Sequence, residues 1–344
     1  MTSIITQQPD RALHCLSSKV PSPGEGEVLI KFLASPVNPL DLLVLAGKYP
    51  VQPKHKHDGE SIIGYDGVGE VISCGAGVSN LAPGDLVVPS QFGVGTWRSQ
   101  AAIKASMLQK ISSPKEAAFA CLLRMAVGPA YFLVEEMRDL KPGEYIIQNA
   151  GTSAVAQYVT QFAARRGVST IHVIRDRSSE ETVTTKKALL SLGAAEVLTE
   201  SELADHAATL KSSRRIALAL DSVYGVSGSK LLTALSDEGT FVHLGFLGGS
   251  DGNLQLGPQD LFGRRLTLRG FRGSAHMAAR SSEEQGNLLN WWVDLFNQGQ
   301  LKLPALGLNF VDWKQSDGGQ AVIDAVNRAR EGKLGQRKQV LLFK

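Results

Sequence analysis

The chain has 344 residues, with 36 Lys and Arg against 33 Asp and Glu, and 43% of its residues are apolar. This is the composition of a globular protein, and the length favours two domains over a single core. A net charge of +3, without a block of five or six like charges, argues against a nucleic-acid or membrane partner.

The first part of the chain is predicted to be rich in β-structure. From Glu27 to about Ile111, short apolar runs are broken by Gly and Pro, which is typical of strands and turns. The runs are EVLIKFLASPVN, GVGEVISCG, PGDLVVP and RSQAAIKA.

After about Cys121 the pattern changes to compact apolar runs that alternate with helical segments, the signature of a parallel sheet. Strands are expected at YIIQNA (from Tyr145), IHVIRD (Ile171), AEVLT (Ala195), RIALALDSV (Arg215), TFVHLG (Thr240) and LTLRGF (Leu266). Helices are expected over 153–166, 182–192, 200–211 and 226–235. Six such strands suit a doubly wound sheet.

The last part of the chain departs from this repeat. A helix near 283–298 is followed by LNFVDW, a helix near 320–330 and the strand KQVLLF. We expect this tail to return to the first unit, so that a β-rich catalytic domain (1–121 and 304–344) is discontinuous and a Rossmann-like cofactor domain (122–303) is inserted into it.

One turn is a candidate phosphate site. In IIQNAGTSAVAQ a strand runs into a turn at Gly151 and a helix begins near Ser153, where backbone N–H groups can hold a pyrophosphate. The dinucleotide fingerprint is incomplete, because Ala154 and Ala156 stand where it has glycine. An ordinary strand-turn-helix connection is the alternative.

The end of the next strand favours NADPH. Arg175, Asp176 and Arg177 stand 24 to 26 residues beyond Gly151, where the adenosine ribose is recognised. Guanidinium groups can pair with a 2′-phosphate, whereas Asp176 alone would suit the 2′-hydroxyl of NADH.

No metal site is expected. The only cysteines are Cys15, Cys74 and Cys121, which fit neither a disulfide framework nor a metal motif and favour a reducing compartment. The pair His55 and His57 has no carboxylate or cysteine cluster to complete a site.

The sequence resembles the zinc-free trans-2-enoyl thioester reductases of the medium-chain dehydrogenase/reductase superfamily, whose first domain is GroES-like. The resemblance is spread over most of the chain. It is carried by VNPLDLLVLAGKYP (Val37 to Pro50), GYDGVGEV (Gly64 to Val71), LAPGDLVVP (Leu81 to Pro89), GTWRSQA (Gly95 to Ala101), LKPGEYIIQNAGTSAV (Leu140 to Val155), IHVIRDR (Ile171 to Arg177) and LRGF (Leu268 to Phe271).

The resemblance implies a reaction and a proton donor. It implies NADPH-dependent reduction of the carbon–carbon double bond of an enoyl-CoA or enoyl-acyl carrier protein, with hydride delivered to the β-carbon. Tyr49 matches the family's tyrosine that protonates the α-carbon. A phenol suits this role because it remains protonated at neutral pH. A half-buried aromatic of the β-domain is the alternative for Tyr49.

The resemblance also implies a set of cofactor contacts. Expected at the pyrophosphate are Thr152, Ser153, Ala154 and Val155; at the adenosine phosphate, Arg175 and Arg177; near the nicotinamide, Leu244, Gly245, Phe246, Leu247, Phe271, Arg272, Gly273 and Ser274; and near the phosphates, Lys338. A place in the core is the alternative for Leu244 and Leu247, and a surface position is the alternative for Lys338.

Several positions depart from the family pattern. Gly128 stands where the family has Asn, Arg272 where it has Trp, and Ala154 and Ala156 where glycine is usual. Arg272 could change the acyl preference, because a cation replaces a flat apolar wall. We therefore expect an altered substrate.

Two further surfaces are expected from the sequence. The basic residues Arg264, Arg265, Arg269 and Arg272, and Lys333, Arg337 and Lys338, could bind coenzyme A phosphates or an acyl carrier protein, or could simply keep an edge strand from pairing. The superfamily implies a homodimer joined at the last strand of the cofactor sheet, LTLRGF.

Two other functions stay open at this point. One is quinone or 2-alkenal reduction on the same scaffold, and the other is a cofactor-binding module without redox turnover. The family implies a mitochondrial location, but the first residues resemble neither a signal peptide nor a presequence, so the cytoplasm is an alternative for this chain, which we expect to be soluble.

Overall fold

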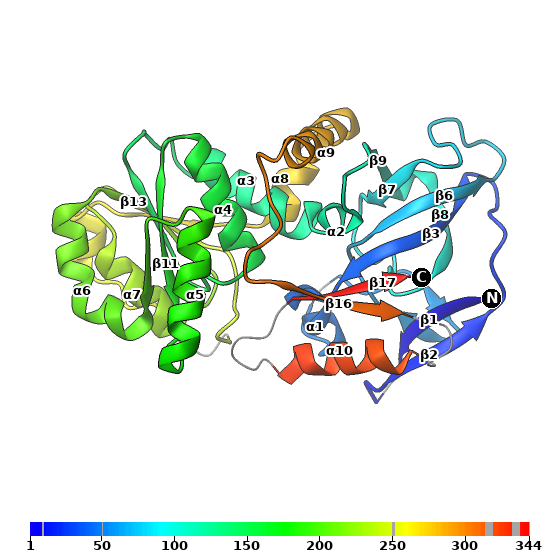
Figure 1. Ribbon diagram of the computed structural model, residues 1–344, viewed down its shortest axis with the longest axis horizontal. Coiled ribbons are helices and arrows are strands. Elements are labelled where there is room, and N and C mark those ends of the chain that lie inside the picture. Colours follow the sequence, from blue (N-terminus) through cyan, green and yellow to red (C-terminus); the bar gives the residue numbers. More distant parts are fainter. Residues whose placement is uncertain (9, 50, 250–251, 314–318, 332–337, 344) are drawn as a thin grey trace. The chain divides into compact units, whose positions relative to one another are not determined.

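The computed structural model describes residues 1–8, 10–49, 51–249, 252–313, 319–331 and 338–343 (Figure 1). The chain divides into two compact units. Unit 1 consists of Met1–Met125, Arg280–Leu303 and Gly307–Lys344, and unit 2 consists of Ala126–Ala279 and Pro304–Leu306.

Two sheets form most of unit 1. The larger has the strand order β16-β17-β3-β6-β7-β9, with β8 paired to β3 outside this order, and the smaller has the order β2-β1-β5-β4. The strands before β16 are β1 Thr2–Gln7, β2 Leu13–Ser18, β3 Glu27–Pro36, β4 Lys56–His57, β5 Glu60–Ile62, β6 Val68–Cys74, β7 Leu86–Pro89, β8 Gln100–Lys104 and β9 Leu108–Ile111. The helices of this part are α1 Pro39–Leu45 and α2 Ala117–Ala120.

Strand β3 shows how the sequence builds this core. Val28, Ile30, Phe32 and Ala34 are all buried, because alternate residues of a strand face the same side of the sheet. Val28, Ile30 and Phe32 belong to one apolar cluster together with residues of the neighbouring strands and of helix α10 (Gln320–Glu331). The β-rich pattern from Glu27 onward therefore corresponds to one sheet-based core.

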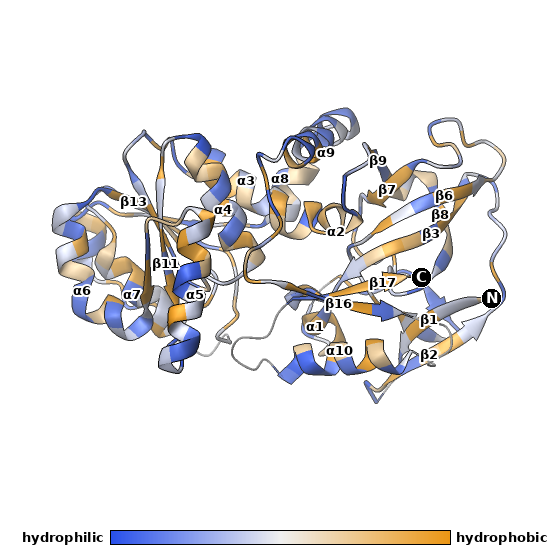
Figure 2. Ribbon diagram, in the orientation of Figure 1, coloured by the Kyte–Doolittle hydropathy of each residue, from blue (hydrophilic) through white to orange (hydrophobic). Residues whose placement is uncertain are grey.

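The end of the chain completes the larger sheet. Strand β17 (Lys338–Phe343) pairs antiparallel with β3 and parallel with β16 (Leu308–Trp313). Helix α10 (Gln320–Glu331) buries Val322, Ala325 and Val326 on one face, while its other residues are largely hydrophilic (Figure 2).

Helix α9 (Ser282–Asn297) belongs to unit 1, whereas the sequence-based boundary placed it in the cofactor domain. Asn290 Oδ1 accepts a hydrogen bond from the backbone N–H of Ser112 at 2.7 Å. The rings of Phe119 and Phe296 stack at 4.1 Å between centroids. These contacts join residues about 180 positions apart, and no local pattern specifies them.

Unit 2 contains the doubly wound parallel sheet that the sequence predicts. Its strand order is β12-β11-β10-β13-β14-β15, and every pair is parallel. The strands are β10 Tyr145–Gln148, β11 Ser169–Ile174, β12 Glu196–Thr199, β13 Ile216–Asp221, β14 Thr240–His243 and β15 Thr267–Gly270. The helices are α3 Gly128–Glu135, α4 Ala154–Arg165, α5 Ser179–Leu192, α6 Glu200–Ser213, α7 Gly225–Ala234 and α8 Gly273–Ala278.

The strand order of unit 2 creates a switch point between β10 and β13. From β10 the chain proceeds to β11 and β12 on one side of the sheet, and it returns to β13 on the other. In sheets of this kind, ligands bind at the carboxyl ends of the strands beside the switch point. The loops that follow β10, β11, β13 and β14 are therefore where a cofactor site is expected.

Candidate active site

The turn after β10 carries the residues predicted to bind pyrophosphate. Thr152 and Ser153 precede α4, and Ala154 and Val155 begin it; Ser153 caps the helix, with its Oγ accepting from the backbone N–H of Ala156 at 3.2 Å. The first backbone N–H groups of a helix lack partners within the helix and can bind an anion. Ala156 stands where the dinucleotide fingerprint has glycine. Its side chain is buried, so the additional methyl group faces the core.

A buried histidine, which the sequence analysis did not single out, lies beneath this turn. His172 Nδ1 lies 2.7 Å from the carbonyl oxygen of Gly151, so Nδ1 carries the proton and donates it. Its Nε2 then accepts from Thr160 Oγ1 at 2.6 Å and from Gln148 Nε2 at 3.0 Å. Burial lowers the pKa of His172 to about 4. The neutral imidazole thus holds the turn in one position.

The close approach of His172 to the turn also explains why position 151 is a glycine. A Cβ at this position would lie 2.8 Å from the Cβ of His172, closer than side-chain atoms approach one another. The glycine of the incomplete fingerprint therefore has a packing reason here.

The three charged residues after β11 have different surroundings. Arg175 is exposed and makes no ion pair or hydrogen bond with the part of the chain that the structure describes. Asp176 Oδ2 accepts from Ser201 Oγ at 3.0 Å. Desolvation raises the pKa of Asp176. Hydrogen bonds from Thr199 and Ser201 lower it by more, so the pKa lies below its usual value. Arg177 is half-buried. The Asp176 carboxylate, which would favour NADH, is thus hydrogen-bonded to Ser201 in the first turn of α6.

A pocket of about 410 Å³ opens at the carboxyl ends of these strands. Its lining includes Ala150 after β10, Arg175 after β11, Tyr224 after β13 and Leu247 after β14. It combines Ala150 of the turn after β10, the Arg175 cation and the Tyr224 ring, while the Glu200 carboxylate, which also lines it, accepts a hydrogen bond from Ser227 Oγ at 2.7 Å. These features fit a phosphorylated dinucleotide, because they offer separate contacts for phosphate and for a flat base.

A second buried network ties the loops of the pocket together. Asp221, at the end of β13, is fully buried, and its Oδ1 accepts from Asn149 Nδ2 at 2.6 Å and from the N–H of Tyr224 at 2.9 Å. His243 Nδ1 lies 3.2 Å from Asp221 Oδ2. Asn149 lies in the segment IIQNAGTSAVAQ that the sequence analysis singled out, but Asp221 was missed, because nothing in the sequence shows that two residues 72 positions apart meet.

The residues expected near the nicotinamide form two segments of unit 2. Leu244 to Leu247 follow β14, with Leu247 at 47% exposure and lining the pocket, and Leu244 half-buried. The alternative that placed these leucines in the core is therefore wrong for Leu247. The segment from Phe271 to Ser274 runs into α8, where Phe271 stacks on His276 at 4.9 Å and Arg272 is exposed.

In unit 1, Tyr49 lies beside a second tyrosine. The rings of Tyr49 and Tyr65 meet edge to face at 6.5 Å, and Tyr65 stacks on Phe92 at 6.0 Å. The Tyr65 hydroxyl donates to the carbonyl of Val51 at 2.6 Å. This hydrogen bond holds the backbone of the segment that follows Tyr49. Burial raises the pKa of Tyr65, so this phenol stays protonated. Pro50, the next residue of the quoted motif, lies outside the described residues.

Unit 1 also holds a polar cluster, formed by buried Asn38, Asp41 and Asp66 and half-buried Arg124 and Lys338. Burial raises the pKa of Asp41 and of Asp66 to about 7. Burial lowers the pKa of Lys338, whose Nζ donates to Asn38 Oδ1. Lys338 is half-buried and bonded to Asn38, which does not fit the surface lysine of the alternative interpretation. Asp66 Oδ2, Arg124 Nη1 and Asn38 Nδ2 have no hydrogen-bond partner among the described residues.

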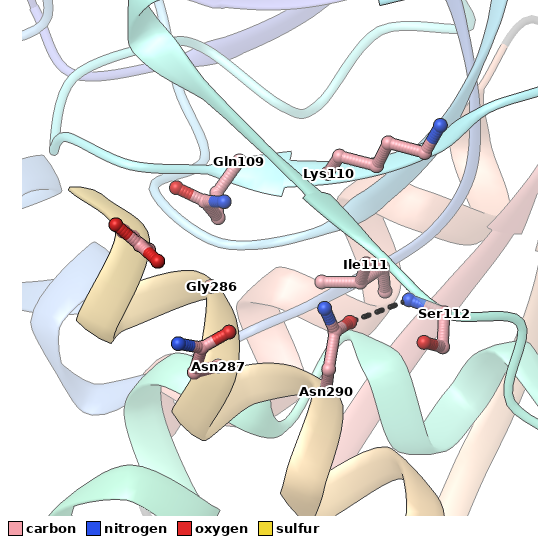
Figure 3. A pocket seen from close by; sticks show the side chains of 8 residues that line it. Gln109, Lys110, Ile111, Ser112, Gly286, Asn287 and Asn290 are labelled. Carbon is pink, nitrogen blue, oxygen red and sulfur yellow. Dashed lines mark hydrogen bonds between the residues drawn. The ribbon is translucent and has the colours of Figure 1, made fainter.

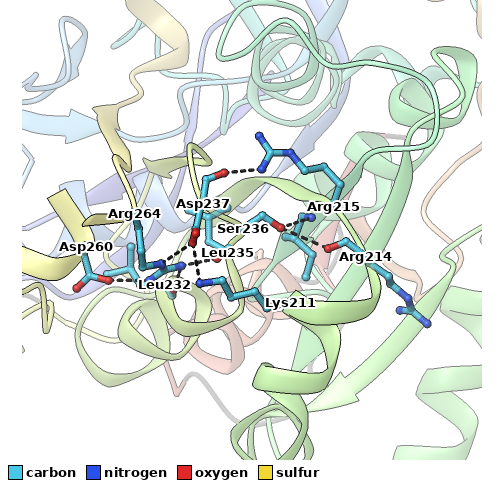
Figure 4. A network of polar contacts seen from close by, with 10 residues as sticks. Lys211, Arg214, Arg215, Leu232, Leu235, Ser236, Asp237, Asp260 and Arg264 are labelled. Carbon is cyan, nitrogen blue, oxygen red and sulfur yellow. Dashed lines mark hydrogen bonds and ion pairs between the residues drawn. The ribbon is translucent and has the colours of Figure 1, made fainter. Parts of the chain in front are cut away.

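Most side chains of the first basic cluster make contacts within the protein, as Figure 4 shows for Arg264. Arg264 pairs with Asp260 at 2.6 Å and donates to the carbonyls of Leu232 and Leu235 at the end of α7. Arg265 pairs with Glu238, and Arg269 donates to the carbonyl of Met137 at 2.7 Å. Only Arg272 of this group has no such contact with the described chain. Lys333 and Arg337 lie outside the described residues.

Unit 1 has a separate hollow of about 310 Å³ between β9 and α9 (Figure 3). Its lining includes Gln109, Lys110, Asn287 and Asn290, with the Asn290 carboxamide bonded to Ser112. None of the predicted site residues lines it.

The residues that the structure describes contain no helix long and apolar enough to cross a membrane. They also contain no group of three or more His, Cys, Asp or Glu side chains placed to hold a metal ion.

Comparison with known proteins identifies relatives over most of the chain. Residues 24–113 match the alcohol dehydrogenase GroES-like domain. The mitochondrial enoyl-(acyl-carrier-protein) reductase of Rattus norvegicus is 37% identical over 295 residues, 84% of this chain and 76% of the relative. A solved complex of Etr1p with NADP and crotonyl-CoA is 25% identical with a TM-score of 0.86, covering 99% of each chain. The mitochondrial 2-enoyl thioester reductase Etr1p/Etr2p heterodimer from Candida tropicalis is 24% identical, also with a TM-score of 0.86 and 99% coverage of each chain.

A GroES-like β-unit and a doubly wound parallel unit with a pocket at its strand ends define a medium-chain dehydrogenase/reductase. The sequence identity narrows this class to one family, because it exceeds 30% over more than two thirds of both this chain and the rat relative. The chain belongs to the enoyl-(acyl-carrier-protein) reductase family.

Proposed function

We propose that this protein reduces the carbon–carbon double bond of a 2-enoyl thioester with NADPH. The observation that carries the proposal is the pocket of unit 2, which Arg175 and Ala150 of the turn before α4 both line, in a chain whose relatives are enoyl reductases. The solved relative that contains NADP and crotonyl-CoA supports both the cofactor and the substrate class.

The residues of unit 2 hold and select the cofactor. The N–H groups at the start of α4 bind the pyrophosphate, and His172 keeps that turn in place. Arg175 pairs with the 2′-phosphate, while Asp176 is held by Ser201 and does not compete for the ribose. When bound, NADPH supplies the hydride for the β-carbon.

Tyr49 supplies the proton for the α-carbon. Enolate charge develops on the thioester as the β-carbon is reduced, and a neutral phenol can donate as that charge forms. The bond from Tyr65 to Val51 fixes the backbone beyond Tyr49, and the Tyr65 ring supports the Tyr49 ring. Tyr65 is therefore a positioning residue for the proton donor.

The acyl carrier and the assembly are further parts of the proposal. Arg272, an exposed cation, is the residue of the first basic cluster that is free to meet coenzyme A phosphates or an acyl carrier protein. All four residues of β15 are exposed at the edge of the sheet, and Leu268 is 39% exposed. An unpaired edge of this kind can pair with a second copy, which supports a homodimer. We propose a mitochondrial compartment, as in the names of the relatives.

The test is to follow NADPH absorbance with crotonyl-CoA, longer enoyl thioesters, a quinone and a 2-alkenal, with NADH as the cofactor control. We expect turnover of the enoyl thioesters with NADPH. Turnover of the quinone or the alkenal alone would establish the alternative reductase activity. Tight NADPH binding without any turnover would instead identify a module without redox function.

A pair of variants tests the proton donor. Tyr49→Phe should lower kcat by about a hundredfold or more, the usual contribution of a general acid, and leave NADPH binding intact. Tyr145→Phe, a matched change at the start of β10, should leave kcat unchanged. Equal kcat in all three proteins would remove Tyr49 from the mechanism.

A further inference from the structure

Tyr224 has a backbone conformation that side chains rarely adopt. It follows β13 and caps α7, with φ of 76° and ψ of 179°. This region of conformational space is essentially confined to glycine, and a residue held there is strained. Such strain persists only where the surroundings impose it, and it concentrates at ligand sites.

Contacts within unit 2 impose this conformation. The N–H groups of Val223 and Tyr224 both donate to Asp221 Oδ1, at 3.0 and 2.9 Å. Asp221 is fully buried and is itself held by Asn149. The Asp221 carboxylate therefore holds the backbone of the loop after β13, and it does so independently of the side chain at position 224.

The Tyr224 ring belongs to a small aromatic cluster at the pocket. Its centroid lies 4.9 Å from that of His243 and 5.7 Å from that of Phe246. Tyr224 is half-buried, and it lines the same pocket as Arg175. The side chain is thus supported on its protein side and still reaches the pocket.

We propose that Tyr224 is a binding residue for the adenine base of the cofactor. The inference deepens the proposed function and rests on it. If Arg175 pairs with the 2′-phosphate, the adenine joined to that same ribose must lie within this pocket of about 410 Å³. Tyr224 is the aromatic side chain of the pocket lining, and a flat base gains stability by stacking on such a ring.

The strain gives the proposal a second readout, because the backbone and the ring of Tyr224 can be changed separately. Compared with Tyr224→Leu, which loses the ring contacts but keeps the strained backbone, Tyr224→Gly relieves that backbone and should have a thermal midpoint about 2–4 °C higher in the free protein. The same change removes the ring and should weaken binding of adenosine 2′,5′-bisphosphate by about tenfold, as loss of one base-stacking contact does.

Two further variants separate the ring from the backbone. Tyr224→Phe keeps the ring and should bind adenosine 2′,5′-bisphosphate as the wild type does, whereas Tyr224→Leu should bind about tenfold more weakly, like the glycine variant. Phe310→Ala, which removes an exposed aromatic from β16 of unit 1, is the control for nonspecific effects and should leave binding unchanged.

Calorimetric titration of the full chain with adenosine 2′,5′-bisphosphate, nicotinamide mononucleotide and NADPH decides between the outcomes. Equal affinity of the leucine, glycine and wild-type proteins for the bisphosphate overturns the inference. So does an effect confined to nicotinamide mononucleotide, which would place the ring at the other end of the cofactor. If the wild type binds neither NADPH nor the bisphosphate, the proposed function itself fails.

Discussion

The buried histidine beneath the cofactor turn predicts a specific dependence of stability on pH. His172 is fully buried, and burial lowers its pKa from 6.5 to about 4. In the unfolded chain the imidazole takes up a proton as the pH falls through about 6.5, while the folded protein keeps it neutral down to about 4. The unfolded state therefore binds more protons in this window, and stability is lost as the pH falls.

The magnitude follows from the difference between the two pKa values. A shift from 6.5 to about 4 corresponds to about 3 kcal/mol, lost progressively between these pH values and fully present above pH 7. This is a large share of the 5–15 kcal/mol that typically separates folded from unfolded protein. It should appear as a fall in the thermal midpoint of unit 2 on mild acidification.

The assay compares His172→Asn with the wild type in thermal unfolding from pH 7.5 to pH 4. The asparagine can still donate to Gly151, but it cannot titrate, so the acid loss should become smaller. Buried Asp41 and Asp66 and half-buried His55 also titrate, and comparison of the two proteins cancels their contributions.

The control is Thr160→Val, which removes a hydrogen bond to the imidazole and keeps the titrating group. It should lower stability at pH 7.5 but retain the wild-type slope. If His172→Asn and the wild type lose the same stability between pH 6.5 and 4, the buried neutral imidazole is not the cause and the reasoning fails.

Four other changes test the site and the assembly. Arg175→Leu should weaken NADPH about tenfold to a hundredfold and leave NADH unchanged, because a charged pair to the 2′-phosphate is lost; an equal loss for both cofactors in a binding titration would contradict this. Tyr65→Phe should cost about 1 kcal/mol and lower kcat more than it changes KM, since the bond to Val51 is lost; a change in KM alone would argue against a positioning role. Arg272→Trp should shift turnover toward longer acyl chains, and an unchanged ratio of crotonyl-CoA to longer homologues would refute an altered substrate. Leu268→Asp on β15 should yield monomers in light scattering, and an unchanged mass would exclude this strand as the seam.

The sequence by itself determined the parts of this protein that depend on local pattern. The alternation of apolar runs and helical segments specified the parallel strands of unit 2, and Gly151, Ser153 and Arg175 were predicted as cofactor residues because they occupy fixed places relative to those strands. Tyr49 and the substrate class came from the resemblance, because a single tyrosine followed by proline has no local signature of acid catalysis.

The tertiary structure decided which side chains meet. It assigned α9 to unit 1, bound Arg264 and Arg265 to acidic partners, and brought His172 under Gly151 and Asp221 against Asn149. A histidine in an apolar strand, or an aspartate at its end, has the same appearance in the sequence whether its partner is solvent or a buried group. Periodicity reports which face of an element is buried, but the choice of partner depends on contacts between residues that are distant in the chain.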